Sequence, residues 1–147
     1  MRYLLRVRLV LDTATMVAAI RSHVGASNRL LILALERRLT LLVSTPLLIE
    51  YEAVMTRVEH LAASGLSAGD VSAILDAVAA VATPVRLAFH WRPALRDPDD
   101  DMVLETAVNG GAEAIVTLNR RDFGAAGQFG LEVLSPGMAL ARVEAGR

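Results

Sequence analysis

The chain has 147 residues, of which 54% are hydrophobic, 4% aromatic and 21% charged, and its formal net charge is -1. This length fits one compact domain spanning residues 1–147, and the aliphatic composition favours an α/β fold with parallel strands between helices. The nearly neutral charge excludes a general basic field that would hold nucleic acid, so any nucleic-acid site must be local.

Two residue types are missing from the chain, and their absence excludes several classes of protein. There is no cysteine, and all 15 basic residues are arginine. The chain therefore has no disulfide framework, thiolate metal site, lysine Schiff base or Walker A phosphate loop. The lack of cysteine also fits a reducing compartment, and we expect a cytoplasmic protein.

The apolar N-terminal stretch predicts neither a signal peptide nor a membrane span. Arg6 and Arg8 interrupt it and Asp12 ends it, and no convincing small-residue cleavage site follows. Nowhere in the chain do about 18 apolar residues follow one another without a charge. We therefore expect no contact with a membrane.

The first predicted strand is residues 7–11, a short apolar run that ends at Asp12, a residue type that often begins a helix. Helices are predicted for residues 14–21 and 27–37, where apolar residues recur at helical spacing on either side of a glycine. The chain therefore begins with a strand followed by two helices.

A second buried strand is predicted for residues 39–43, and the sequence Ser-Thr-Pro after it is a strong start for a helix over residues 47–57. Ser67 and Asp70 have the spacing of a capping box, and apolar residues continue from there at helical spacing to Val81. This part of the chain is therefore again predicted to be a strand followed by helices.

The rest of the chain continues the alternation, which predicts a three-layer α/β/α fold with a central, mainly parallel sheet. In chain order we expect a strand over residues 85–89, a loop over 91–98, a helix over 99–108, a strand over 114–118, a turn over 119–122, a strand over 132–134 and a terminal helix after Ser135.

Acidic residues recur where these strands lead into the following helices. Asp12 ends the first strand, Glu50 lies in the helix after the second, Asp97 to Asp101 surround a helix start, and Asn119 with Asp122 follows a later strand. Ligands bind at the carboxyl ends of parallel strands, and clustered carboxylates are costly without a cation. Mg²⁺ or Mn²⁺ would suit these oxygen donors and could activate water against a phosphodiester.

Four segments, in this order, resemble PIN-domain proteins, and especially the ribonuclease toxins related to VapC. They are VLDT at residues 10–13, STPLLIEYEAVM at 44–55, RDPDDDMVLETAV at 96–108 and AIVTLNRRDF at 114–123. The resemblance covers nearly the whole chain. It implies a Mg²⁺- or Mn²⁺-dependent endoribonuclease with a central parallel sheet, commonly a homodimer and commonly neutralised by an antitoxin.

The resemblance also implies roles for individual residues. Asp12 matches the first metal-site aspartate, Glu50 the helix glutamate and Asp100 the third acid, with Asp101 as a near alternative. Asn119 and Asp122 belong to the turn after the Val-Thr sequence. Thr13 and Thr117 are expected to support the site.

One position departs from the family pattern. The family usually carries Asp-Thr-Asn after the first strand, whereas this chain carries Asp12, Thr13 and Ala14. A polar side chain that would help to order the turn is therefore missing. We expect a working but less ordered metal site, in which Ala14→Asn should raise the rate of cleavage.

Four arginines flank the acidic segments, and we expect them to hold the RNA backbone because the guanidinium fork matches phosphate geometry. They are Arg92, Arg96, Arg120 and Arg121. Ordinary ion pairing with the neighbouring aspartates explains them equally simply. The three histidines show no spacing typical of metal ligands.

Other interpretations of the acidic residues stay open. Asp12 can be a helix cap, Asp99 to Asp101 can serve the helix dipole, and Asn119 can be a turn residue. The chain can also be a PIN fold that binds RNA or an antitoxin without turnover. A receiver domain fails for want of lysine, and an Asp-x-Asp phosphatase fails because Ala14 replaces its second aspartate.

Overall fold

The computed structural model of the chain describes residues 6–88 and 98–146. Its centre is one parallel sheet of five strands in the order β3-β2-β1-β4-β5. The strands are β1 (Arg8–Leu11), β2 (Thr40–Val43), β3 (Thr83–Pro84), β4 (Ala114–Val116) and β5 (Glu132–Leu134). The predicted parallel sheet is therefore confirmed.

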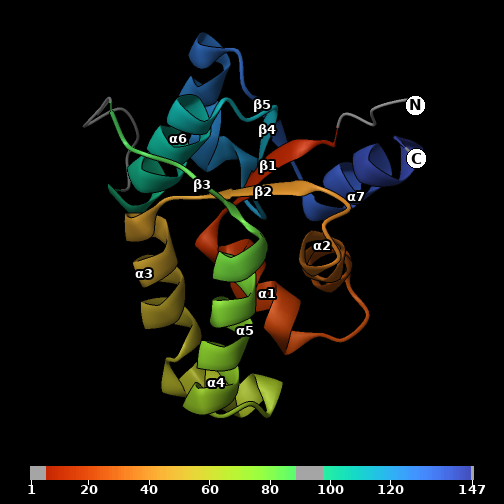
Figure 1. The fold of residues 1–147 in the computed structure, drawn as a ribbon, viewed down its shortest axis with the longest axis vertical. Helices are drawn as coiled ribbons and strands as arrows, with labels where there is room; N and C mark the ends of the chain where they lie inside the picture. The colour runs from red at the N-terminus through yellow and green to blue at the C-terminus, as the bar shows by residue number, and fades with distance from the viewer. Residues whose placement is uncertain (1–5, 89–97, 147) are drawn as a thin grey trace.

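Helices cover both faces of this sheet (Figure 1). Helices α1, α2, α3 and α5 lie below the sheet in the view, and α6 lies above it, where it contacts β1, β2 and β4. The last helix, α7, packs against α2 and β5. The helices are α1 (Thr13–Arg21), α2 (Ala26–Leu35), α3 (Thr45–Met55), α4 (Val58–Ser64), α5 (Ala68–Val81), α6 (Pro98–Gly110), the 3₁₀ helix η1 (Arg120–Phe129) and α7 (Pro136–Ala145).

The direction of winding reverses beside the central strand. From β1 the chain moves outward to β2 and then β3, and afterwards it returns to β4 on the other side of β1 and moves outward to β5. Leu11 is aligned with Val116, so the carboxyl ends of β1 and β4 lie side by side. A reversal of this kind opens a crevice at the strand ends, which is where parallel α/β sheets bind ligands.

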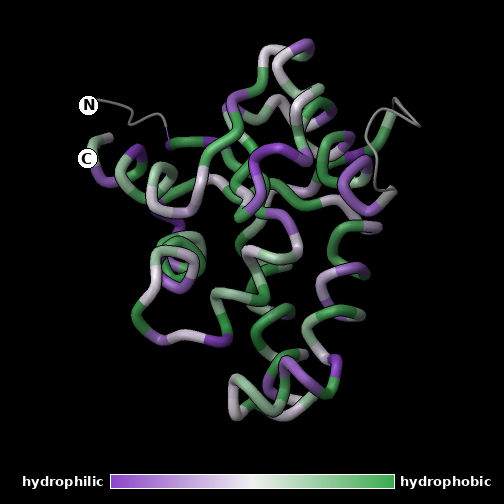
Figure 2. Tube along the Cα trace, turned by 180° about the vertical axis from the view of Figure 1, so that it is seen from behind, coloured by the Kyte–Doolittle hydropathy of each residue, from purple (hydrophilic) through white to green (hydrophobic). Residues whose placement is uncertain are grey.

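The interior is aliphatic, as the composition predicts. Leu9, Val10 and Leu11 of β1 are fully buried, and so is the whole of β4. These strands have helices on both faces, so their side chains are apolar in both directions. Figure 2 shows hydrophobic colouring along the strands and hydrophilic colouring at the start of α6, beside the grey trace. The hydrophobic core therefore ends close to an acidic rim.

The predicted helix caps are formed by side chains. Asp12 caps α1, Ser44 caps α3 and Ser135 caps α7, each by accepting a hydrogen bond from a backbone amide in the first turn. Ser67 and Asp70 form the complete capping box of α5. Each cap satisfies an amide that the helix itself leaves without a partner.

Three local predictions differ from the structure. The strand expected at residues 85–89 is not formed at residues 85–88, and residue 89 lies outside the described residues. The third strand is instead the two-residue β3, after which Val85 donates its amide to Val43. The turn expected at 119–122 begins η1, and α4 was not predicted. The loop expected at residues 91–98 lies almost wholly outside the described residues, and Pro98 begins α6.

Within the described part of the chain, no single helix is long and apolar enough to cross a membrane. Helices α4 and α5 meet this criterion of length and composition only when taken together, and they are bent by 87° at the break between them.

Candidate active site

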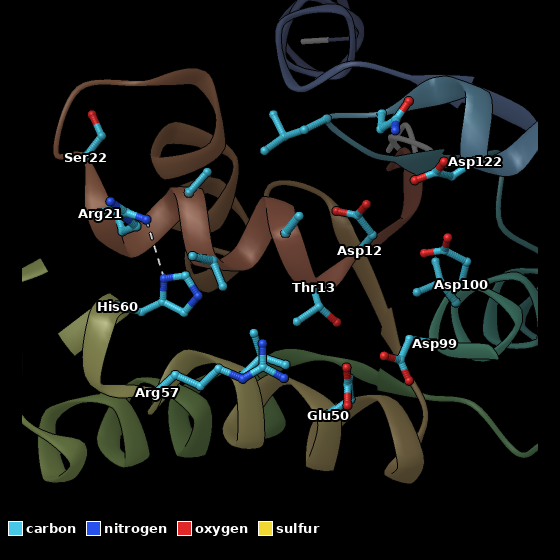
Figure 3. A pocket seen from close by; sticks show the side chains of 17 residues that line it. Asp12, Thr13, Arg21, Ser22, Glu50, Arg57, His60, Asp99, Asp100 and Asp122 are labelled. Carbon is cyan, nitrogen blue, oxygen red and sulfur yellow. Dashed lines mark hydrogen bonds between the residues drawn. The ribbon is translucent and has the colours of Figure 1, made fainter. Parts of the chain in front are cut away.

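A pocket of about 650 Å³ lies at the crevice beside the ends of β1 and β4 (Figure 3). Its walls come from α1, from α3 with the start of α4, from the first turn of α6 and from the segment between β4 and η1. Segments from four distant parts of the sequence therefore meet in one place.

Helical periodicity determines which side chains of α1 and α3 line the pocket. On α1 these are Thr13, Ala14, Val17, Ala18 and Arg21, which share one helical face. On α3 the same rule applies to Glu50 and Val54, which are four residues apart, and Arg57 joins them from the break between α3 and α4. A neighbouring face of α3 carries Leu47, Tyr51 and Met55 into the core.

Asp12 lies at the centre of the site and is held by several hydrogen bonds. Its Oδ1 accepts bonds from the Thr15 amide at 2.8 Å and the Thr15 hydroxyl at 2.6 Å. Its Oδ2 accepts a bond from the Thr117 hydroxyl at 2.5 Å, and its own amide donates to the Val116 carbonyl. The side chain is only 7% exposed, so its orientation is set by β4 as well as by its own helix.

Buried polar contacts also position the helices around Asp12. The Tyr51 hydroxyl donates to the Leu11 carbonyl, one residue before Asp12. Burial, together with the negative charge of Asp12, raises the pKa of Tyr51, so the phenol remains a donor. Ser44 and Thr106 share a buried hydrogen bond of 2.7 Å, which joins the start of α3 to α6. Glu50 and the acidic start of α6 are thereby brought to the same edge.

One end of the pocket is acidic. Figure 3 shows Asp12 facing this end together with Asp122, Asp100, Asp99 and Glu50. Within residues 6–88 and 98–146, no three histidine or carboxylate side chains converge closely enough to hold a metal ion. The donor set has the hard oxygen atoms that Mg²⁺ and Mn²⁺ prefer, so the residues fit such an ion in chemical type and location. Binding would have to draw the carboxylates closer together.

The other end of the pocket is basic and was not predicted as part of a site. Arg21, Arg57 and His60 line it, and a hydrogen bond of 3.5 Å joins Arg21 to His60 (Figure 3). Arg21 lies on the same face of α1 as Thr13, whereas Arg57 lies in the break between α3 and α4, where it is the N-cap of α4. Helical spacing was the signal in the sequence that could have indicated Arg21, and the helix predicted over residues 47–57 would have placed Arg57 about two turns after Glu50.

The structure places the remaining predicted residues in different surroundings. Thr13 and Asn119 line the pocket, and Thr117 supports it by donating a hydrogen bond to Asp12. Asp101 is 2% exposed and does not line the pocket, which distinguishes it from Asp100.

The arginines predicted to bind RNA do not line this pocket in the described part of the chain. Arg120 and Arg121 line a neighbouring hollow that shares Leu118 and Asn119 with the pocket. Arg92 and Arg96 lie outside the described residues.

Comparisons with known proteins agree with this architecture. The crystal structure of VapBC2 from Rickettsia felis bound to a DNA fragment from its promoter contains a chain with the same fold, with a TM-score of 0.60 at 18% sequence identity. The match covers 87% of this chain and 98% of that chain. No curated protein matches the sequence. The PIN domain matches residues 8–121, which include β1, β4 and, except for Asp122, every acidic residue at the pocket. The chain belongs to the PIN-domain family.

Proposed function

We propose that this protein is a divalent-metal-dependent endoribonuclease and the toxin of a toxin–antitoxin pair. The observation that carries the proposal is the acidic end of the pocket, where Asp12, Glu50, Asp100 and Asp122 line one crevice at the switch in winding direction. PIN domains are generally nucleases and typically use divalent metal ions, which supports the same chemistry. The similarity to the VapBC2 chain supports the role as a toxin.

The chain's own residues would divide the work in the following way. Asp12, Glu50 and Asp100 hold the metal and orient the attacking water, and Asn119 or Asp122 completes the set. A bound Mg²⁺ or Mn²⁺ supplies a Lewis acid that activates water and offsets negative charge on the phosphodiester. Thr15 and Thr117 keep the Asp12 carboxylate in one orientation, so less ordering is required when the substrate binds.

Calorimetric titration with Mn²⁺ tests the site directly. We expect the wild-type chain to bind Mn²⁺ and the Asp12→Asn, Asp100→Asn variant to lose that binding, because the substitutions remove two charged oxygen donors. The Glu36→Gln, Asp76→Asn variant is a control with the same change of charge, since both residues are exposed and lie outside the pocket. Equal binding by all three chains would contradict the assignment.

Cleavage of single-stranded RNA tests the activity. We expect Mn²⁺-dependent cleavage that EDTA abolishes, and a loss of at least about 100-fold in the Asp12→Asn, Asp100→Asn variant, since removing the metal removes several kcal/mol of transition-state stabilisation. Induced expression of the wild-type chain in bacteria should arrest growth, whereas expression of the variant should not. Growth arrest by both chains would argue against toxicity through RNA cleavage.

A second candidate function is a PIN fold that binds RNA or an antitoxin without turnover. Two observations favour it: Ala14 stands exposed at the pocket beside Asp12, and no three described carboxylates converge. A folded wild-type chain that binds neither Mg²⁺ nor Mn²⁺ and cleaves no RNA would support this alternative. As a toxin we also expect the chain to act in the cytoplasm, to form a homodimer and to be neutralised by a cognate antitoxin.

A further inference from the structure

The pocket is electrostatically divided along its length. Asp12 begins α1 at the acidic end and Arg21 ends the same helix at the basic end (Figure 3). Nine helical residues separate the two ends by about 13 Å. Val17, Ala18 and Val54 form an apolar wall between them. One continuous surface therefore carries clustered acids, an apolar stretch and clustered cations in that order.

Among the residues that the structure describes, no carboxylate forms an ion pair with the cations at the basic end. The only interaction of the Arg21 side chain within the described part of the chain is its hydrogen bond to Nδ1 of His60. Since a guanidinium always donates, Nδ1 accepts, which leaves the ring hydrogen on Nε2. The side chain of Arg57 forms no hydrogen bond or ion pair with any residue in ranges 6–88 and 98–146. Its guanidinium extends along the pocket toward Glu50 (Figure 3).

Two permanent positive charges that share a partly apolar pocket repel each other and lose part of their hydration, which costs free energy. An anion bound between them would offset that cost. Arginine forks match the geometry of phosphate oxygens, and the Nε2 hydrogen of His60 is a further donor. We propose that Arg21, Arg57 and His60 form a subsite for a backbone phosphate of single-stranded RNA, away from the bond that is cut. The subsite rests on the proposed function, because the metal end defines where cleavage occurs.

The length of the pocket determines which phosphate this subsite would hold. At about 3.4 Å of rise per stacked nucleotide, a separation of about 13 Å corresponds to roughly four nucleotides. The subsite therefore binds the substrate several nucleotides from the reacting phosphate. It improves the binding of long substrates and takes no part in the chemical step.

An acidic segment of a partner protein could also contact Arg21 and Arg57. The observations favour RNA, because the same pocket presents Asp12, Glu50, Asp99 and Asp100 at its other end and these would repel a carboxylate-rich peptide. A nucleic acid can satisfy both ends, since its backbone phosphates suit the arginines and a metal-bound phosphate suits the acids.

The binding test compares two double variants in an Asp12→Asn background, which prevents cleavage. The probe is a fluorescent single-stranded RNA of about eight nucleotides, and anisotropy is measured over a range of salt concentrations. The test variant is Arg21→Gln, Arg57→Gln. The control is Arg37→Gln, Arg38→Gln, which makes the same change of charge at exposed positions between α2 and β2, outside the pocket.

We expect the test variant to bind about tenfold more weakly, and the slope of log K against log salt concentration to become shallower by about 0.7, the value for one lost phosphate contact on a single strand. The control should match the parent chain. Circular dichroism and thermal unfolding of both variants would establish that they are folded. Identical affinity and salt dependence in the test and control variants would overturn the subsite.

Cleavage kinetics separate the subsite from the metal end. In chains with an intact Asp12, Arg21→Gln, Arg57→Gln should raise KM for the long RNA with little change in kcat, and should not affect cleavage of a dinucleotide, which cannot reach both ends. If the substitutions weaken RNA binding while no chain cleaves RNA, the subsite stands and the proposed nuclease activity fails. If wild type cleaves RNA and the substitutions change neither KM nor affinity, the nuclease stands and the subsite fails.

A poly-glutamate peptide completes the test. Tighter binding of this peptide than of RNA, lost in the Arg21→Gln, Arg57→Gln variant, would overturn the proposal in favour of an acidic segment of a partner protein. Weak peptide binding that both double variants share equally is the result expected for a phosphate subsite.

Discussion

Asp12 is a helix cap and a candidate metal ligand through the same carboxylate. The hydrogen bonds from Thr15 serve the cap, whereas the bond from Thr117 reaches the carboxylate from the end of a neighbouring strand. A cap needs only the local bonds, so the contact from Thr117 goes beyond what α1 requires. This additional contact fixes the direction in which Asp12 presents its remaining lone pairs to the pocket.

Replacing Thr117 tests that contact. Thr117→Val keeps the shape of the side chain but removes the hydroxyl that donates to Asp12 and accepts from the Asn119 amide. Removing this partner from the buried Oδ2 of Asp12 and from the part-buried Asn119 amide should lower the free energy of unfolding by about 1–3 kcal/mol and weaken Mn²⁺ binding. Urea denaturation and calorimetry measure the two effects. Thr117→Ser, which retains the hydroxyl, should stay close to wild type, and equal losses in both variants would contradict this explanation.

Ala14 is the residue at which the chain departs from its family, and the structure places it exposed at the pocket. Ala14→Asn should increase Mn²⁺ affinity and the rate of RNA cleavage several-fold, because an amide beside Asp12 can help to order the turn and the bound water. Ala18→Asn, one helical turn further along the same face, is the matched control. An unchanged or lower affinity in Ala14→Asn would count against the idea that this position limits activity.

At the scale of elements, close packing between α6 and the edge of the sheet holds the acidic first turn of α6 in place. Gly110, at the end of α6, lies so close to its neighbours that a Cβ atom would stand 2.8 Å from Val85 Cγ2 and 3.2 Å from Leu42 Cδ1. Its carbonyl also accepts a 2.6 Å hydrogen bond from Arg8 Nη2. The helix therefore approaches β2 closely only because this residue lacks a side chain.

We expect Gly110→Ala to destabilise the protein by about 1–3 kcal/mol through overpacking, despite the better helix propensity of alanine. Gly137→Ala in the first turn of α7 is the control, since its Cβ would have no atom within 4 Å. Urea denaturation of both variants checks this. A Gly110→Ala variant as stable as the control would show that the sheet edge can move away.

The capping box of α5 makes stability depend on pH. The Ser67 amide donates to the Asp70 carboxylate, and with the Ser67 side chain it holds the pKa of Asp70 below its ordinary value. A lowered folded-state pKa stabilises the protein above the unfolded pKa of about 3.9, and that contribution disappears as the pH falls through the folded-state value.

Asp70→Ala should therefore be less stable than wild type at neutral pH, and the difference should shrink as the pH falls below about 4. Denaturation with urea at a series of pH values measures this. Asp76→Ala, at an exposed position on the same helix, controls for the change in helix propensity. A difference between wild type and Asp70→Ala that stays constant down to about pH 2 would contradict the role of the carboxylate.

At the scale of the whole molecule, several large apolar side chains remain exposed. Val24 is 94% exposed, Val58 82% and Ile49 62%. Apolar exposure of this kind is compatible with association, and we expect light scattering to report twice the chain mass of 15.7 kDa at micromolar concentration. The single-chain mass at every concentration would contradict a constitutive homodimer.

The sequence by itself determined most of the elements and their order, because these depend on local chemistry. Short apolar runs bounded by Asp12, Ser44 and Ser135 indicated strands followed by capped helices, and their alternation required a parallel sheet. Parallel strands end at one edge, so the order of the elements along the chain predicted Glu50 and the acidic residues 97–101 at the same edge as Asp12. The choice of Asp100 among them came from the resemblance to PIN-domain proteins. The two-residue β3 was misplaced because a pairing this short depends on its neighbour β2 more than on its own residues.

Only the tertiary structure decided which faces meet across the pocket. Helical periodicity shows that Arg21 shares a face of α1 with Thr13. The break between α3 and α4 at Arg57, and the way in which α1 packs against α3, determine that these residues and Glu50 enclose one space. Tertiary packing also buries Asp101 while leaving Asp100 at the pocket, although they are adjacent in the sequence. Adjacent residues on a helix point in different directions, and only contacts between distant segments decide which of them is covered.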